Sequence, residues 1–288
     1  MNDSSNPLSV SNDRPLDPLT TEILTVIDET LRKLECPWML VGATARDLLL
    51  VHVFGMHVTR ATRDVDFGIA VESWEQFSAV RTAILAAGRF TEDSRTTHRL
   101  LYRSPNSEHP IPVDFIPFGG IADPEGRIAW PPDADFVMNV SGFAEALGDA
   151  LRVRVNERLT VPVVSLAGLA ILKLIAWNER RSDKDATDFH RILSSYGDAG
   201  NADRLYDEEV AVLEQEEFDF ESAGAFLLGR DASAISTKAT RRQVLALLSD
   251  KSVLQGLTFQ MLGPRGHMED AFAGAAGLLD RFIRGLVA

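Results

Sequence analysis

Three aspartates in two apolar segments have the type and spacing of a metal site. The segment RDVDFGIAV, residues 63–71, holds Asp64 and Asp66 two positions apart, so a strand would present both carboxylates on one face. The segment IPVDFIPF, residues 111–118, carries Asp114 in the same alternation with apolar residues. If the two strands are neighbours, three carboxylates converge. Because unpaired buried charge is costly, such a group needs counter-ions, water or a ligand.

These carboxylates favour magnesium, or manganese, as the bound ion. The set contains only oxygen ligands and no His or Cys, which suits a hard cation whose coordination substrate phosphates complete. Two such ions would activate an attacking oxygen and stabilise a leaving pyrophosphate. In the simpler alternative, Asp64 pairs with a neighbouring arginine and Asp114 caps a turn. An isolated DxD tripeptide is common, so the prediction depends on its combination with a second motif.

The second motif is a glycine turn in WMLVGATARDLLL, residues 38–50. A strand ends at Gly42 and a helix begins at once, which aims free N–H groups at a bound phosphate. Thr44 adds a hydroxyl and Arg46 a positive charge one turn further along. The alternative is an ordinary strand-to-helix connection with Arg46 in a surface ion pair. Followed by the acidic strands, the turn indicates a nucleotide site.

Hydrophobic periodicity predicts the elements that hold these motifs. In the first half, helices alternate with short strands, which predicts an α/β (α+β) fold with a mixed sheet. From about residue 165 five segments have helical periodicity with no convincing strand between them, which predicts an all-helical second half. We therefore expect a flexible tail over 1–16, an α/β domain over 17–162 and a helical domain over 163–288. Expected helices cover 18–35, 73–88, 165–181, 183–197, 240–250, 252–262 and 268–286, and expected strands cover 36–42, 63–71, 97–104 and 111–120.

The charge of the 288-residue chain is −13, which argues against a general nucleic-acid coat. Nine acids and one base fall within residues 203–221. Basic residues instead recur around the acidic motifs: Arg46, Arg60, Arg63, Arg89, Arg95, Arg99 and Arg103. A locally basic cleft could hold a polyanion, and Arg95, Arg99 and Arg103, spaced by four, predict a basic stripe that contacts RNA phosphates. Alternatively, these arginines pair with the acids of residues 203–221.

Other features of the sequence indicate the cellular location of the protein. The single cysteine excludes an internal disulfide. No apolar run is long enough to span a bilayer, and the N-terminus lacks the pattern of a signal peptide. These features predict a cytoplasmic protein with no membrane partner.

The three segments VGATARDLLL, TRDVDFGIAV and VDFIPFG together resemble the nucleotidyltransferase superfamily that includes DNA polymerase beta. The resemblance implies a nucleotidyltransferase fold with an NTP as co-substrate. It implies that Asp64 and Asp66 bind both metal ions and that Asp114 binds the catalytic one. It also implies that Gly42 and its neighbours hold the triphosphate.

Within this superfamily two groups compete. The RDLLL segment is similar to tRNA CCA-adding enzymes and poly(A) polymerases, but neither an RRD-type motif nor a templating motif follows. Residues 165–193, SLAGLAILKLIAWNERRSDKDATDFHRIL, resemble the helix pair of AbiEii-like toxins of abortive-infection and type IV toxin–antitoxin systems. That resemblance implies that Lys173 contacts the nucleotide and that Asp185 and Asp188 close the site. The chain departs from the pattern at Ala43, where Ser or Gly is usual, and at Lys184, where Arg is usual.

Taken alone, the residues of this helix pair leave other interpretations open. Lys173 lies in apolar surroundings, where a lysine either extends its amino group outward or meets an anion. Asp185 and Asp188 share one helix face, which also fits a solvated face with Arg180 or Lys184 nearby.

We therefore expect a magnesium-dependent enzyme that moves a nucleoside monophosphate from an NTP to an acceptor. By resemblance the acceptor is RNA, at a tRNA 3′ end, and the enzyme is a toxin with an antitoxin protein as partner. The alternatives are nucleotidylylation of a small molecule of the aminoglycoside type or of a protein, and a non-catalytic NTP-binding interaction module.

Overall fold

The chain folds into two units, Met1–Val164 and Ser165–Ala288. The structure, a computed structural model, describes residues 7–57, 64–105 and 107–288. Two of the basic residues noted in the sequence, Arg60 and Arg63, lie outside these described residues.

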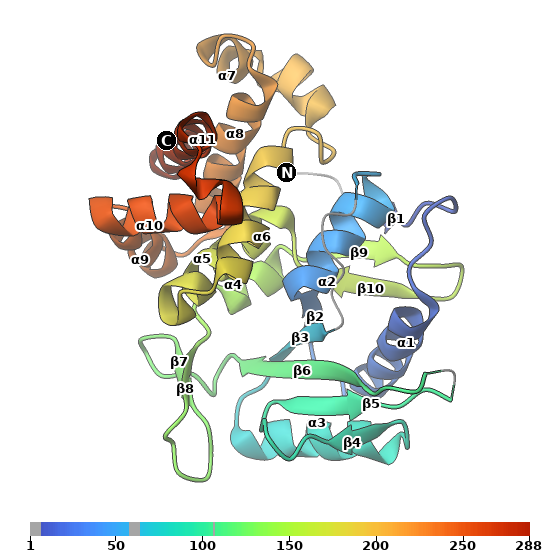
Figure 1. Ribbon diagram of the computed structural model, residues 1–288. Coiled ribbons are helices and arrows are strands. Elements are labelled where there is room, and N and C mark those ends of the chain that lie inside the picture. The colour runs from blue at the N-terminus through green and yellow to red at the C-terminus, as the bar shows by residue number, and fades with distance from the viewer. Residues whose placement is uncertain (1–6, 58–63, 106) are drawn as a thin grey trace. The chain divides into compact units, whose positions relative to one another are not determined.

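The first unit is built on an eight-stranded mixed sheet, counted over the described residues, in the order β1-β9-β10-β2-β3-β6-β5-β4. Strands β3 and β6 are parallel neighbours near its middle, and β5 and β4 follow on one side (Figure 1). The strands are β1 Leu8–Ser9, β2 Trp38–Val41, β3 Val65–Ala70, β4 Phe90–Glu92, β5 Arg99–Tyr102, β6 Ile111–Phe118, β9 Leu151–Arg154 and β10 Thr160–Val163. A separate hairpin pairs β7 Arg127–Ala129 with β8 Val137–Asn139.

The two longer helices of this unit begin where the sequence supplies caps. Helix α1, Pro18–Lys33, starts after Asp17, whose carboxylate accepts a hydrogen bond from the backbone N–H of Thr20 at 3.0 Å. Helix α3, Trp74–Ala86, starts after Ser73, whose hydroxyl accepts from the backbone N–H of Gln76. The remaining helices are α2 Gly42–Asp47, which continues as the π-helical segment η1 Leu48–Val53, and α4 Phe143–Gly148.

An aromatic core fixes the sheet beneath the acidic residues. The ring of Phe67 on β3 stacks on Phe115 of β6, with centroids 5.6 Å apart, and contacts Trp38 of β2 at 5.5 Å. All three side chains are buried. Because successive residues of a strand point to opposite faces, burying Phe67 and Phe115 directs their neighbours Asp66 and Asp114 to the other face.

Several strands were not predicted from the sequence. Residues 8–9, which fall within the expected tail, form β1 and pair in parallel with β9. Strands β9 and β10 and the hairpin β7–β8 were likewise not predicted. Each of these strands has only two to four residues, too few for alternation to distinguish a strand from a loop. Strand β1 pairs with β9 and β10 pairs with β2, which are distant in the chain, and the loop between β7 and β8 is longer than the two-residue turn that marks a hairpin in a sequence.

The second unit, from yellow to red in Figure 1, consists of helices, as predicted. Its helix α8 packs along α11, where an added Cβ on Gly229 would lie 2.0 Å from the carbonyl oxygen of Phe282, so only glycine allows the approach. Among the described helices, none has both the length and the apolar character needed to cross a membrane. The elements are α5 Leu166–Arg180, α6 Asp183–Ser195, η2 Arg204–Glu208, α7 Val210–Gln215, α8 Phe220–Ile235, α9 Lys238–Leu247, α10 Lys251–Leu262, η3 Gly263–His267 and α11 Glu269–Val287.

Candidate active site

The sheet places the three sequence motifs of the first unit on adjacent strands. Asp66 of β3 stands opposite Asp114 of β6 in the parallel register. On its other side, Asp66 stands opposite Val41, the last residue of β2 before the glycine turn. Asp64 immediately precedes β3 and is half-buried, as is Asp66. The neighbourhood of β3 and β6 that the sequence interpretation requires is therefore present.

Gly42 makes room for the Asp66 carboxylate. Its φ is +71°, a left-handed conformation that side chains disfavour. A Cβ placed on Gly42 would lie 2.0 Å from Asp66 Oδ2, well inside contact distance. The glycine thus allows a sharp turn from β2 into α2 and at the same time brings the turn into contact with the second aspartate of the DxD pair.

The other residues of the turn are buried and engaged within the unit. The Thr44 hydroxyl donates a hydrogen bond to the backbone carbonyl of Asp64 at 2.8 Å, which ties the turn to the start of β3. Arg46, only 2% exposed, donates from Nε and Nη2 to Asp47 Oδ1 at 2.9 and 2.7 Å. Ala43 is buried beside them. Arg46 therefore does form an ion pair, with Asp47, but its guanidinium is buried and does not lie on the surface.

Asp114 is held by an arginine that the sequence interpretation had placed on RNA. Arg99 lies opposite Asp114 in the β5–β6 register and donates two hydrogen bonds, Nε to Oδ1 at 2.6 Å and Nη2 to Oδ2 at 2.8 Å. This fork-to-fork pairing is the strong geometry for a guanidinium and a carboxylate. These hydrogen bonds raise the pKa of Arg99 above its ordinary value, and the nearby charges of Asp64 and Asp93 act in the same direction.

The three aspartates have the ligand chemistry of a divalent-cation site. Asp64, Asp66 and Asp114 offer only carboxylate oxygens, the ligands that magnesium prefers. The guanidinium of Arg99 shows that a positive charge is stabilised at Asp114. In the arrangement described, both Asp114 oxygens face Arg99, and no group of three or more His, Cys, Asp or Glu side chains among the described residues forms a metal site. An ion at Asp114 would therefore have to share the carboxylate with Arg99 or displace it.

The three arginines of the expected stripe do not lie on one regular element. Arg99 begins β5 and is bound to Asp114. Arg103 follows β5, with its backbone N–H bonded to the carbonyl of Arg89, and its side chain is exposed. Arg95 lies in the turn before β5, where its backbone N–H donates to the Asp93 carboxylate. The even spacing does not produce a stripe, because the chain turns between residues 92 and 99.

In the second unit, Lys173 lies in a buried ion cluster. Its Nζ is 3.1 Å from Asp185 Oδ1 and 2.7 Å from Asp188 Oδ2, across the pair of helices α5 and α6. Arg180 adds two hydrogen bonds to Asp185, at 2.8 and 2.9 Å. The two cations balance the two anions. Lys173 therefore meets anions of its own chain, and Asp185 and Asp188 are buried instead of forming a solvated face.

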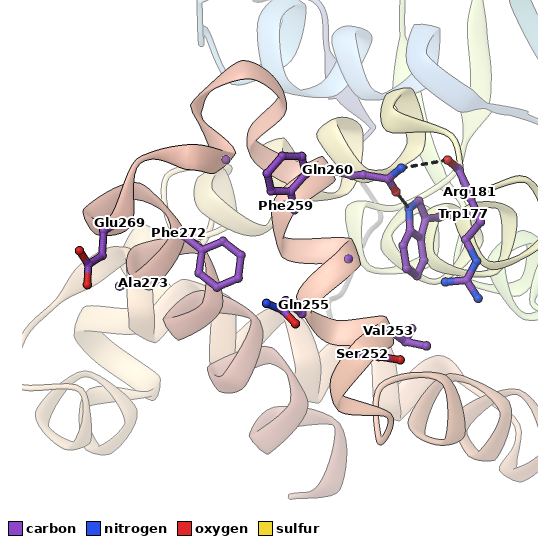
Figure 2. Close-up of a pocket in the computed structure, with 12 residues that line it drawn as sticks. Trp177, Arg181, Ser252, Val253, Gln255, Phe259, Gln260, Glu269, Phe272 and Ala273 are labelled. Carbon is purple, nitrogen blue, oxygen red and sulfur yellow. Dashed lines mark hydrogen bonds between the residues drawn. The ribbon is translucent and has the colours of Figure 1, made fainter.

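The first unit has a cavity beside the acidic residues, and the second unit has a larger groove. A cavity of about 470 Å³ in the first unit is lined by residues that include Thr44, Asp47 and Asp64, beside the acidic site. A more open groove of about 1120 Å³ lies in the second unit (Figure 2). There Gln260 accepts from Trp177 Nε1 at 2.5 Å and donates to the Arg181 carbonyl at 3.2 Å. None of the predicted site residues lines that groove, so its larger volume does not mark the chemistry.

A glycine turn, a DxD strand and a third aspartate on the adjacent parallel strand define the class of nucleotidyltransferases. The comparison with known families identifies one family within this class. Residues 27–254, more than half of the chain, match the model of the family "Nucleotidyl transferase AbiEii toxin, Type IV TA system". The chain belongs to this family, and the protein is a nucleotidyltransferase of the AbiEii toxin type, as the sequence motifs predicted.

The solved structures to which this chain is similar are distant. The antibiotic-resistance factor ANT(2'')-Ia is 16% identical, with 70% of this chain and 98% of that chain covered and a TM-score of 0.38. An antigenic nucleotidyltransferase-like protein from Paracoccidioides brasiliensis is 18% identical over 76% and 94%, with a TM-score of 0.42. The Thermotoga maritima CCA-adding enzyme complexed with tRNA is 11% identical over 91% and 67%, with a TM-score of 0.26. No curated protein matches the sequence. Family membership, not these distant similarities, identifies the activity.

Proposed function

We propose that this nucleotidyltransferase uses magnesium and transfers a nucleoside monophosphate from an NTP to the 3′ end of an RNA, with tRNA as the expected acceptor. The observation that carries the proposal is the in-register pairing of Asp66 with Asp114 beside the Gly42 turn. Membership of the AbiEii family supports it, as does the carboxylate-only donor set.

In the proposed reaction the acceptor's 3′ hydroxyl oxygen bonds to the α-phosphorus of the NTP. The bond from that phosphorus to the bridging oxygen of the β-phosphate breaks, pyrophosphate leaves, and the hydroxyl proton passes to solvent. Asp64, Asp66 and Asp114 would hold the magnesium, which when bound supplies positive charge to the phosphates and to the attacking oxygen.

The chain's own residues organise the reactants in three ways. The helical segment that begins at Gly42 offers its first N–H groups to the triphosphate. Thr44 fixes this turn to the start of β3 through its hydrogen bond to the Asp64 carbonyl. This bond sets the distance between the bound triphosphate and the carboxylates at β3. Arg99 holds Asp114 in one orientation through two charge-assisted hydrogen bonds.

The proposed acceptor is tested by incubating the protein with each of four α-³²P-labelled NTPs and total cellular RNA. We expect label in RNA from at least one NTP, and none after periodate oxidation of the RNA, because oxidation destroys the terminal diol and its 3′ hydroxyl. Asp66→Asn should abolish the labelling while the circular dichroism spectrum is unchanged. Labelling that survives periodate would exclude the 3′ end as acceptor.

As a toxin, the protein is expected to have an antitoxin protein as partner. Expression of the wild-type chain alone should therefore arrest bacterial growth, and Asp66→Asn should relieve the arrest. Arrest by both forms at equal protein levels would show that toxicity does not depend on nucleotidyl transfer.

A further inference from the structure

A hairpin outside the main sheet carries aromatic residues that contact His98, a neighbour of the third aspartate. Strands β7 and β8 form this hairpin, and the backbone N–H of Trp130, just after β7, bonds to the carbonyl of Phe136, just before β8, at 2.9 Å. The Trp130 ring is 4% exposed and packs on Trp74 and Phe77 of α3, with centroid distances of 5.1 and 5.7 Å. The buried tryptophan anchors the end of the hairpin to the core of the unit.

His98 connects this hairpin to the acidic site. Its ring lies 5.6 Å from that of Trp130 and 6.0 Å from that of Phe136, with the planes of His98 and Phe136 only 23° apart. Its Nε2 is 4.0 Å from Asp114 Oδ2. The carbonyl of His98 also accepts from the backbone N–H of Phe115, so the residue is fixed directly beside Asp114. Phe136, His98 and Asp114 thus form one continuous row.

The exposed member of this row is Phe136. Its side chain is 47% exposed, whereas Trp130 is buried and the His98 side chain is 19% exposed. One exposed aromatic residue is ordinary on a protein surface. This ring, however, is stacked on His98 and is still 47% exposed, so a solvent-accessible aromatic ring lies within one intervening side chain of the carboxylate that the proposed reaction requires.

We infer that Phe136 is an acceptor-positioning residue that stacks on the terminal base of the acceptor RNA and thereby places the attacking 3′ hydroxyl at Asp114. The inference rests on the proposed function and adds to it the recognition of a single-stranded end. Every base has a flat face, and aromatic side chains hold unpaired bases by stacking on them. A residue that acts in this way tolerates different sequences but requires a base.

The test asks whether the effect of substituting Phe136 depends on the presence of the terminal base of the RNA. Steady-state kinetics compare Phe136→Ala, Phe136→Leu and Phe136→Tyr on an RNA oligonucleotide and on the same oligonucleotide whose terminal nucleotide lacks its base. On the complete RNA, Phe136→Ala should raise the acceptor KM about 5- to 150-fold and leave the KM for NTP unchanged. Phe136→Tyr should restore the KM, whereas Phe136→Leu, apolar but not flat, should not. Phe218→Ala, which removes a ring that is 68% exposed in the other unit, is the matched control and should change nothing.

On the oligonucleotide without a terminal base, the wild type and Phe136→Ala should have the same KM. An equal loss on both acceptors, or no loss on either, overturns the inference. Fluorescence anisotropy of the labelled oligonucleotide without NTP provides a separate readout, in which Phe136→Ala should weaken binding to the complete RNA alone. If the wild type binds RNA through Phe136 but does not label it, the proposed function fails while the stacking role stands. Unchanged binding overturns the stacking role.

Discussion

Replacing Gly42 with alanine tests how the glycine turn and the DxD pair depend on each other. The added Cβ would lie 2.0 Å from Asp66 Oδ2, and carbon atoms of this kind are not found closer than about 3.0 Å to such a neighbour. The carboxylate oxygen must therefore withdraw by about 1 Å. Because that oxygen is the end of a rotatable side chain, the fold can accept the change, but the carboxylate can no longer keep its position.

The expected effects on stability and on rate are therefore different in size. A left-handed φ costs an alanine about 1–2 kcal/mol, which lowers the melting temperature by about 2–8 °C in a domain of this size. A displacement of 1 Å in a reacting group can reduce the rate about 100-fold. We expect Gly42→Ala to show both the modest loss of stability and the large loss of kcat.

Gly88 provides the matched control. Its φ is +75°, close to that of Gly42, but an added Cβ would meet nothing within 4 Å. Gly88→Ala should therefore lower the melting temperature by a similar amount and leave NTP turnover near that of the wild type. Calorimetry and label transfer from NTP measure the two quantities. If Gly42→Ala turns over NTP as fast as Gly88→Ala, the position of Asp66 beside the turn does not matter and the reasoning is refuted.

Three further outcomes are expected. Asp64→Asn should keep the melting temperature but reduce label transfer by several orders of magnitude, and near-normal transfer would contradict a role in metal binding. Lys173→Met leaves two buried aspartates with Arg180 as their only remaining cation and should destabilise the protein by about 3–5 kcal/mol in urea unfolding. The control Lys184→Met, at an exposed position, should not change the stability. If folded Lys173→Met keeps full turnover at low temperature, the predicted contact of Lys173 with the nucleotide is wrong. Burial and the charges of Arg265 and Arg191 lower the pKa of His190. Between pH 7 and pH 5 the unfolded chain therefore takes up a proton at His190 more readily than the folded chain, and the free energy of unfolding falls. His190→Gln should lose less free energy of unfolding over this pH range, and an equal loss would show that His190 does not contribute.

The acidic core of the site could be predicted because its signal is local. Alternation in β3 and β6 fixes which face each side chain takes, so Asp66 and Asp114 follow from Phe67 and Phe115 being buried. The turn at Gly42 is equally local. The expected helix over 73–88 begins at the right place, because the Ser73 hydroxyl satisfies a free N–H of the first turn of α3.

What could not be predicted depends on register between distant strands. Arg99 meets Asp114 only because β5 and β6 pair with this exact offset, which the connection between them determines and the spacing of arginines does not reveal. The row from Phe136 to Asp114 likewise needs the loop of the hairpin β7–β8 to pack against His98, and no periodic pattern marks that contact. For Lys173, the apolar neighbours left an outward amino group and a contact with an anion both open, and only the packing of α5 on α6 shows which anions it meets.

The most direct test of nucleotidyl transfer at this site follows both ends of the NTP in one reaction. With the NTP that labels RNA best, α-³²P and γ-³²P forms are incubated in parallel with RNA, magnesium and either the wild type or Asp66→Asn. We predict that the α label enters RNA, that the γ label appears as pyrophosphate in an equal amount, and that Asp66→Asn produces neither. The γ label in RNA, or transfer of the α label at the wild-type rate by Asp66→Asn, would contradict nucleotidyl transfer at Asp64, Asp66 and Asp114.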